Sequence, residues 1–199
     1  MILTYYNKIE LADKFNIAIV FVLSQDPKNL YGDWENKVRK LETEQYKNPE
    51  FKPFKDNKVN WDGFIAWCKY FTICKTIGSN DYFDFAPIIK SFIKNQYANK
   101  CRIEIHHFLQ DLSKFIPFFQ NGEYWNNCRK KMSNIYDYPD NELNAYTSLA
   151  LFKLDQENVI KINPKSSDSQ NIVFFTKGYN TKLKNNNGDI FEVSEIEIL

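Results

Sequence analysis

Apolar residues recur at helical spacing over most of the chain before residue 144. Side chains three or four positions apart form the buried stripe of an amphipathic helix. In one such stretch Phe64, Trp67, Phe71 and Cys74 share a stripe, which should face the core. The pattern predicts helices over residues 29–48, 60–78, 84–99, 101–116 and 123–138.

Boundary signals accompany some of these helices. Gly78 follows the second one and suits the position just past a helix end, because glycine adopts a positive φ at little cost. Asp84 precedes the third helix as a capping residue, with Pro87 in its first turn. The fourth helix should start at Lys100 or Cys101.

The N-terminal stretch allows two interpretations. Helical spacing at Ile2, Tyr5, Tyr6 and Ile9 leads into the continuous apolar run 17–23. Periodicity alone does not separate a buried helix from a buried strand in such a run. The preceding pattern favours a helix over residues 15–23, and a strand stays open.

Residues 48–58 carry two prolines and little periodicity. This composition is typical of a loop or a short extended connector. We expect a protease to cut the chain first in this segment.

The pattern changes after Asn144, where short β-branched or aromatic runs are separated by turn-forming residues. Such runs predict antiparallel strands, and the Asn187–Gly188 pair favours a tight hairpin turn. The predicted strands cover residues 145–154, 158–163, 171–177, 179–184 and 189–198.

The predicted fold class is therefore α+β. A mainly α-helical body of about five to six helices is followed by a small C-terminal antiparallel β-sheet. Residues 1–143 form the helical body, and residues 144–199 form a small antiparallel β subdomain packed on it. At 199 residues we expect the two parts to make one folding unit.

Charge and composition narrow the classes of function. The 26 basic and 25 acidic side chains give a net charge of +1, which lacks the strong positive field of a dedicated nucleic-acid binder. Residues 1–135 hold 20 basic and 15 acidic side chains, and the remainder holds 6 and 10. Aromatic residues make up 17% of the chain, which predicts a core of large rings or an aromatic contact surface.

The cysteines give no sign of a metal site. Cys68, Cys74, Cys101 and Cys128 lack C-x-x-C spacing and a histidine at zinc-ligand spacing, so we expect reduced thiols and neither metal nor cofactor. The N-terminus lacks the pattern of a secretory signal, and its longest apolar run is too short to span a bilayer. The sequence predicts a soluble cytoplasmic protein without membrane contact.

Arg102 and His107 form the pattern Arg-x4-His, which resembles the R-x4-6-H signature of HEPN ribonucleases. The resemblance covers six residues, and Ile103 stands where that family usually has a polar residue. It implies a helical dimer in which both residues sit at a helix start and act on the 2′-hydroxyl and phosphate of RNA. The residues alone allow another interpretation, because Glu104 and Asp111 would flank His107 on an ordinary solvent-facing helix side.

Two further groups of residues are candidate contact sites. Trp125 lies next to Arg129, Lys130 and Lys131, and rings mixed with cations are typical of single-strand nucleic-acid sites. An amphipathic helix with its ring in the core explains the same residues. Near the C-terminus, four carboxylates suit either the outer face of a last strand or an edge that steers a basic partner: Asp189, Glu192, Glu195 and Glu197.

These observations favour a non-catalytic protein of bacterial or phage origin. We expect an inhibitor or immunity-type protein that binds and blocks a macromolecular partner, such as a nucleic-acid-binding toxin or a nuclease, with direct RNA contact as a second form of binding. The alternative is a HEPN-like endoribonuclease of a toxin or abortive-infection system that uses Arg102 and His107 across a dimer. The sequence leaves the choice between binding protein and enzyme open.

Overall fold

The mainly helical α+β architecture predicted from the sequence is confirmed. The structure, a computed structural model, describes residues 10–30, 34–97, 100–135, 138, 141–164, 172–175 and 190–199. The chain divides into two compact units, which are described separately. Unit 1 comprises residues 1–83 and 116–136, and unit 2 comprises residues 84–115 and 137–199. The predicted division after residue 143 stays a prediction.

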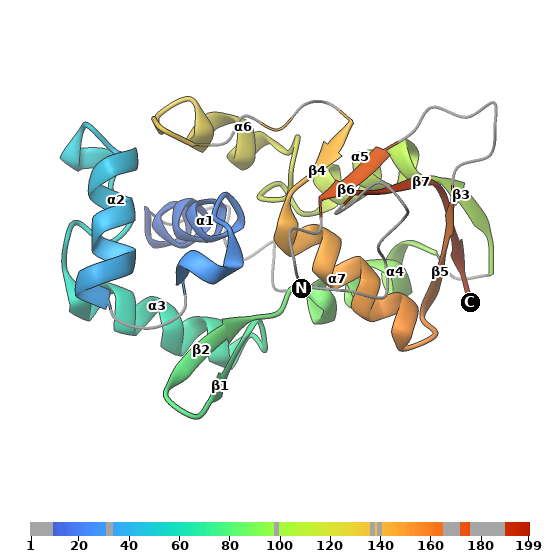
Figure 1. Ribbon diagram of the computed structural model, residues 1–199, viewed down its shortest axis with the longest axis horizontal. Coiled ribbons are helices and arrows are strands. Elements are labelled where there is room, and N and C mark those ends of the chain that lie inside the picture. The colour runs from blue at the N-terminus through green and yellow to red at the C-terminus, as the bar shows by residue number, and fades with distance from the viewer. Residues whose placement is uncertain are drawn as a thin grey trace. The chain divides into compact units, whose positions relative to one another are not determined.

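Unit 1 is built around helix α1, whose C-terminal half is buried on all sides. Figure 1 shows α1 enclosed by α2, α3 and α6. The helices of unit 1 are α1 (Glu10–Leu23), η2 (Pro27–Leu30), η3 (Trp34–Val38), α2 (Arg39–Gln45), η4 (Pro49–Phe51), α3 (Lys58–Tyr70) and α6 (Glu123–Arg129), and its hairpin strands are β1 (Cys74–Ile77) and β2 (Asn80–Phe83). The favoured helix over residues 15–23 is thus confirmed, and the strand is excluded.

The predicted helix over residues 29–48 is wrong as a single element. The chain forms the short 3-10 helix η2, the π-helical turn η3 and then α2. Trp34 and Val38 point into the core as expected. Glu42 and Gln45 are buried as well, because each has a buried polar partner that a helical pattern does not reveal.

The helix predicted over residues 60–78 ends earlier. α3 stops at Tyr70, where Thr72 adopts a φ of 61° and the N–H of Ile73 donates to the carbonyl of Cys68 at 2.9 Å. Thr72 thus takes the left-handed position expected for Gly78. Gly78, with a φ of 63°, instead lies in the turn that joins β1 to β2.

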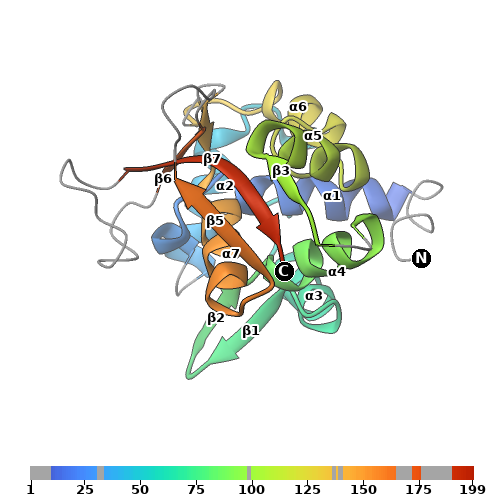
Figure 2. The same cartoon turned by 90° about the vertical axis from the view of Figure 1, so that its right-hand side faces the viewer.

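Within its described residues, unit 2 combines three helices with a five-stranded sheet. Helix α5 packs against β7, and α7 packs against β5 and β6. Figure 2 shows β7 running between β3 on one side and β5 and β6 on the other. The elements of unit 2 are α4 (Ala86–Gln96), β3 (Arg102–Glu104), α5 (Ile105–Phe115), β4 (Glu142–Leu143), α7 (Ala145–Gln156), β5 (Ile160–Pro164), β6 (Ile172–Phe175) and β7 (Ile190–Ile198).

The start of α4 agrees with the sequence signals. The carboxylate of Asp84 accepts the N–H of Ala86 at 3.1 Å, and Pro87 lies in the first turn. The next helix does not start at Lys100 or Cys101 as predicted. Residues 102–104 form β3, because they pair with the C-terminal half of β7, and α5 begins at Ile105.

The strand predicted over residues 145–154 is wrong, because these residues form helix α7. Asn144 caps this helix by accepting the N–H of Thr147 at 3.0 Å. α7 is buried around most of its circumference, Thr147 and Ser148 included, so it lacks the exposed polar stripe that distinguishes a helix from a buried strand. The strands predicted at 158–163, 171–177 and 189–198 are found as β5, β6 and β7 within their described parts.

The remaining C-terminal predictions fall outside the described residues. These are the strand over residues 179–184 and the hairpin turn at Asn187–Gly188. The sheet is antiparallel except for the pair formed by β4 and β6, which run parallel. Among the described residues, no helix combines the length and the apolar character needed to cross a bilayer.

Candidate functional site

Arg102 and His107 lie on different elements of unit 2. Arg102 is in β3, where its Nε is 3.7 Å from a carboxylate oxygen of Glu197. His107 is in the first turn of α5, with its Nδ1 3.4 Å from a carboxylate oxygen of Glu104. Both side chains are largely exposed. The placement of both residues at one helix start, which the HEPN resemblance implies, is therefore not present.

Strands β3, β7 and β5 assemble a surface that we call the polar sheet face. Antiparallel partners point to the same side of a sheet, so the register places six side chains together. Glu197 of β7 lies between two cations, and Glu195 lies between a carboxylate and an amide. The polar sheet face consists of Arg102, Glu104, Lys161, Asn163, Glu195 and Glu197.

The structure thus brings together residues that the sequence placed in two separate candidate sites. Arg102 from the ribonuclease motif meets Glu197 from the acidic group. Because β7 is an inner strand, its acids lie on a sheet face and not along a free edge. Glu192 is exposed on the same strand, and Asp189 lies outside the described residues. The pairing of β5 with β7 is irregular between Asn163 and Pro164, where the register shifts.

Glu195→Gln is expected to stabilise the protein slightly. Glu195 faces Glu104 directly across the strand pair, and like charges in that position repel. We expect the free energy of unfolding to rise by about 0.2–1 kcal/mol at low salt and the gain to fade at high salt. Urea unfolding at two salt concentrations measures this change. Glu50→Gln removes an exposed acid from η4 as the control, and an equal gain there would contradict the cross-strand explanation.

His107→Ala is expected to leave folding, cellular function and any effect on RNA unchanged. The side chain is mostly exposed, and a solvent-facing pair with Glu104 contributes little to stability. His106→Ala on the same turn is the matched control. The measurement is RNA cleavage by the purified variants together with their toxicity in cells. If the parent and His106→Ala cleave RNA while a folded His107→Ala does not, the protein is a ribonuclease and His107 is part of its active site.

The second candidate group lies on α6 of unit 1. Trp125 is only 4% exposed, and the guanidinium carbon of Arg129 lies 4.9 Å from the centroid of its ring. A base therefore finds no open ring face at Trp125 on which to stack. Lys130 and Lys131 are exposed, and the ammonium of Lys131 lies 4.5 Å from the centroid of the Phe51 ring. An amphipathic helix that buries its ring in the core and exposes its lysines to solvent accounts for this arrangement.

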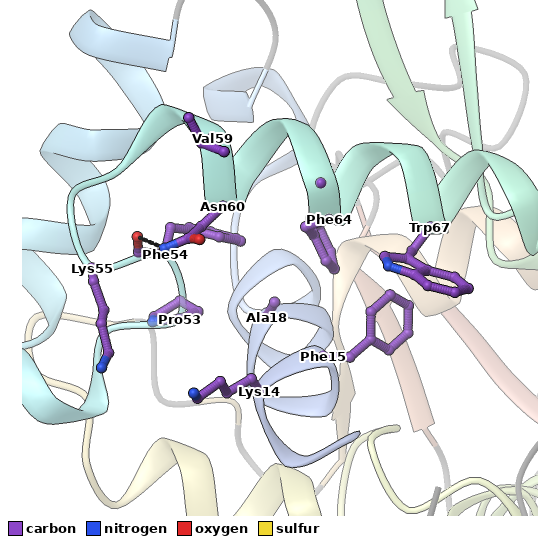
Figure 3. A pocket seen from close by; sticks show the side chains of 11 residues that line it. Lys14, Phe15, Ala18, Pro53, Phe54, Lys55, Val59, Asn60, Phe64 and Trp67 are labelled. Carbon is purple, nitrogen blue, oxygen red and sulfur yellow. Dashed lines mark hydrogen bonds between the residues drawn. The ribbon is translucent and has the colours of Figure 1, made fainter. Parts of the chain in front are cut away.

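A groove that sequence reasoning missed lies on unit 1 between α1, α3 and the loop at residues 53–55. Its volume is ≈ 490 Å³, within the range of ligand and peptide pockets. Figure 3 shows side chains from all three segments turned toward it. The groove is lined by Lys14, Phe15, Ala18, Pro53, Phe54, Lys55, Val59, Asn60, Gly63, Phe64 and Trp67.

Two polar interactions hold the loop wall of this groove. The buried carboxylate of Glu42 accepts the backbone N–H groups of Phe54, Lys55 and Asp56 at 2.5, 3.1 and 3.0 Å. These donors converge because Lys55 and Asp56 both have positive φ angles, 52° and 54°. The amide of Asn60 donates to the carbonyl of Phe54 at 2.9 Å, which ties the loop to α3 (Figure 3).

The outer edge of the groove is an exposed apolar stripe on α3. Val59, Trp67 and Tyr70 are 74%, 49% and 76% exposed. Their spacing places them with Gly63 along one side of the helix. Trp67 stacks on Phe71 with 5.8 Å between ring centroids, which fixes the indole at the surface. We call Val59, Gly63, Trp67 and Tyr70 the α3 stripe.

The sequence contained a signal for this stripe. The predicted core stripe included Trp67, but its ring is half exposed. Trp67 belongs to a second stripe, which lies beside the core stripe and faces solvent. Val59, Gly63 and Trp67 recur four residues apart, so a helical plot separates them from the buried side chains Phe64 and Cys68. Aromatic residues therefore serve both in the core and on a surface.

The described residues contain no group of three or more His, Cys, Asp or Glu side chains arranged to hold a metal ion. The four cysteines are free thiols, and burial raises the pKa of Cys74 to about 12. Such a thiol is protonated at neutral pH and is a poor nucleophile. The groove itself is lined by aromatic and aliphatic side chains together with Lys14, Lys55 and Asn60.

Together these features define an α+β protein with an exposed apolar groove on unit 1 and a polar sheet face on unit 2. A family model described as DpdG-like matches residues 7–169 of the 199-residue chain. The chain therefore belongs to the DpdG-like family. Neither a curated protein nor a solved structure matches it.

Proposed function

We propose that this protein is a non-catalytic, protein-binding component of a bacterial phage-defence or DNA-modification system. DpdG is part of such a system, and membership in its family supports a role of the same kind. The observation that carries the binding role is the α3 stripe beside the groove. The partner is another protein of the system.

The composition of the α3 stripe supports this proposal. Contiguous apolar side chains at a surface rimmed by polar residues mark interaction sites in soluble proteins. Tryptophan and tyrosine are the side chains that most often dominate binding energy, and Trp67 and Tyr70 lie next to each other here. The stacking of Trp67 on Phe71 reduces the rotamer freedom that binding would remove.

Inhibition of a nuclease or toxin is the specific action that we propose for this binding. An immunity-type protein inhibits its target by covering the target's surface, and an exposed apolar groove suits such a contact. The cytoplasm is the compartment we propose, and four free thiols are consistent with it. The ribonuclease alternative stays open through Arg102 and His107 and is decided by the His107→Ala measurement above.

Co-purification tests the proposal. The tagged chain is isolated from cells that carry the whole system, as the parent and as the double variant Trp67→Ala/Tyr70→Ala. The parent should bring down another protein of the system, and the double variant should lose most of it, because two central aromatic anchors are worth about 2 kcal/mol or more each. A parent that restores phage defence while purifying without any other protein of the system would contradict the proposal.

A further inference from the structure

Gly63 lies in the middle of α3, and nothing in the described part of the chain requires a glycine there. Apart from proline, glycine is the least favourable residue in a helix interior. A Cβ at this position would meet no atom within 4 Å, and the φ of Gly63 is not in the left-handed range. The missing side chain therefore serves neither close packing nor a special backbone conformation. It leaves bare backbone at the exposed surface of α3.

Gly63 belongs to a row of exposed residues that runs along the outer side of α3. The row consists of Val59, Gly63, Ala66 and Tyr70, at spacings of four, three and four residues. Because a helix turns by about 100° per residue, this spacing keeps all four within one narrow strip, as in the seam of a coiled coil. We call these four residues the α3 seam.

The α3 seam has the same order of sizes in both directions. From either end, a larger side chain is followed by two small residues and then by another larger side chain. Two copies of α3, packed antiparallel about a two-fold axis between Gly63 and Ala66, would place small residues opposite small residues and Val59 opposite Tyr70. Small residues at the crossing let the helix axes approach to about 8 Å, the close end of the usual range. The seam is therefore complementary to itself.

The charges beside the seam are complementary in the same arrangement. Asp62 and Lys69 lie on the same flank of the seam, given their positions around the helix. In the antiparallel pair, Asp62 of one copy lies close to Lys69 of the second copy, and the two-fold axis repeats this contact. Within its own chain Asp62 pairs with Lys58 at 2.6 Å, and Lys69 pairs with Asp81 at 2.9 Å. A carboxylate and an ammonium group can each take a further partner, so the contacts add to these pairs.

We infer that a second copy of this protein binds along the α3 seam and forms an antiparallel, two-fold symmetric dimer. Size order and charge both match the seam to itself, and this selects a second copy as its occupant. The inference goes beyond the proposed function and does not depend on it. Val59 and Gly63 also line the groove, so a second copy and a partner protein in the groove exclude each other. The dimer is thus the form from which such a partner displaces one copy.

Sedimentation equilibrium of the purified full-length protein tests for the dimer. Three turns of helix from each copy make a small interface, so we expect a dissociation constant on the order of 10 µM. Gly63→Gln should weaken the dimer by about tenfold or more, because its side chain holds the two backbones apart. The same variant should raise the melting temperature of the monomer, since glutamine favours a helix. Ser79→Gln, in the exposed turn between β1 and β2, is the control and should change the constant by less than about twofold.

Charge reversal tests the identity of the occupant and the register. Asp62→Lys makes both flank charges positive and Lys69→Asp makes both negative, so each variant should dimerise about tenfold more weakly than the parent at low salt. An equal mixture of the two variants should recover the dimer, because positive flanks then meet negative ones. Glu50→Lys and Lys47→Asp reverse exposed charges elsewhere on unit 1 and should stay within about twofold of the parent. Circular dichroism checks folding, and Gly63→Gln decides if a charge variant does not fold.

Three results would overturn the inference. They are a parent that stays monomeric above about 100 µM, a dimer that Gly63→Gln leaves unchanged, and a mixture of folded charge variants that stays monomeric. The proposed function is judged separately by co-purification. A monomeric parent that still brings down another protein of the system would remove the dimer and keep the proposed function. A dimer sensitive to Gly63→Gln, in a parent that restores defence without binding another protein, would do the reverse.

Discussion

Phe54→Ala is expected to lower the free energy of unfolding by about 3–5 kcal/mol. Phe54 is 1% exposed and forms the base of the groove wall. Its ring centroid lies 5.0 Å from that of Trp61, 5.4 Å from that of Phe64 and 5.7 Å from that of Phe21. Alanine would remove these ring contacts and leave a cavity that helices on two sides cannot fill.

Urea unfolding of the purified protein measures this loss. Phe54→Leu keeps part of the volume and should cost clearly less than Phe54→Ala. Tyr70→Ala is the exposed control on α3 and should change the free energy of unfolding by about 0.5 kcal/mol or less. A loss below about 1 kcal/mol for Phe54→Ala would mean that this ring does not organise the core of unit 1.

Glu42→Ala should be similarly destabilising, by about 3–5 kcal/mol. The carboxylate is fully buried and accepts the N–H groups of Phe54, Lys55 and Asp56. Without it the buried N–H of Phe54 and the part-buried N–H groups of Lys55 and Asp56 lose their acceptor, at a turn whose conformation already requires positive φ angles. Glu44→Ala on the same helix is the exposed control and should cost little. If both variants unfold alike, the carboxylate does not hold the turn.

The pH dependence of Glu42 has a definite sign. Burial raises the pKa of this carboxyl above its ordinary value of 4.5, and the N–H groups of Phe54 and Asp56 hold back the rise. The folded protein therefore binds the proton more tightly than the unfolded chain, and this contribution to stability is full below pH 4.5 and is lost as the pH rises through the folded pKa. Glu42→Gln imitates the protonated carboxyl.

The unfolding free energy of the parent relative to that of Glu42→Gln should thus fall as the pH is raised from 4 toward neutrality, because only the parent has to ionise a buried carboxyl. Urea unfolding of both proteins across this range measures the difference. A parent that gains stability relative to Glu42→Gln as the pH rises would show that the three N–H donors outweigh burial and lower the pKa.

The sequence predicted the class of the fold because most helices have one polar side. Where a helix lacked that side, prediction failed, as in α7, whose burial on nearly all sides resembles that of a central strand. The boundary at residues 102–104 was missed for a different reason. Those residues continue a helical stripe, but they pair with β7, which lies about 90 residues further along the chain.

The segment over residues 48–58 illustrates how tertiary contacts override composition. Its prolines and charges predicted a loop open to protease. In the structure Phe54 lies in the core, and Glu42 binds the backbone of the following turn. First cleavage of the chain in this segment stays a prediction, with residues 48–50 as its exposed part before the turn.

The candidate sites were predictable only in part. Arg102, Glu195 and Glu197 were identified by type, but their assembly on one sheet face depends on strand register, which a single sequence does not give. The groove was missed because α1, the loop at 53–55 and α3 contribute to it from separate parts of the chain. Its one sequence signal was the recurrence of Val59, Gly63 and Trp67.

The central claim is that the α3 groove, and not the polar sheet face, contacts a protein partner. Photo-crosslinking in cells that carry the whole defence or modification system tests it most directly, with p-benzoylphenylalanine placed at Trp67 in one variant and at Lys161 in another. We predict a crosslink from position 67 to another protein of the system and none from position 161. Crosslinks from position 161 alone, or from position 67 to nucleic acid alone, would contradict the account.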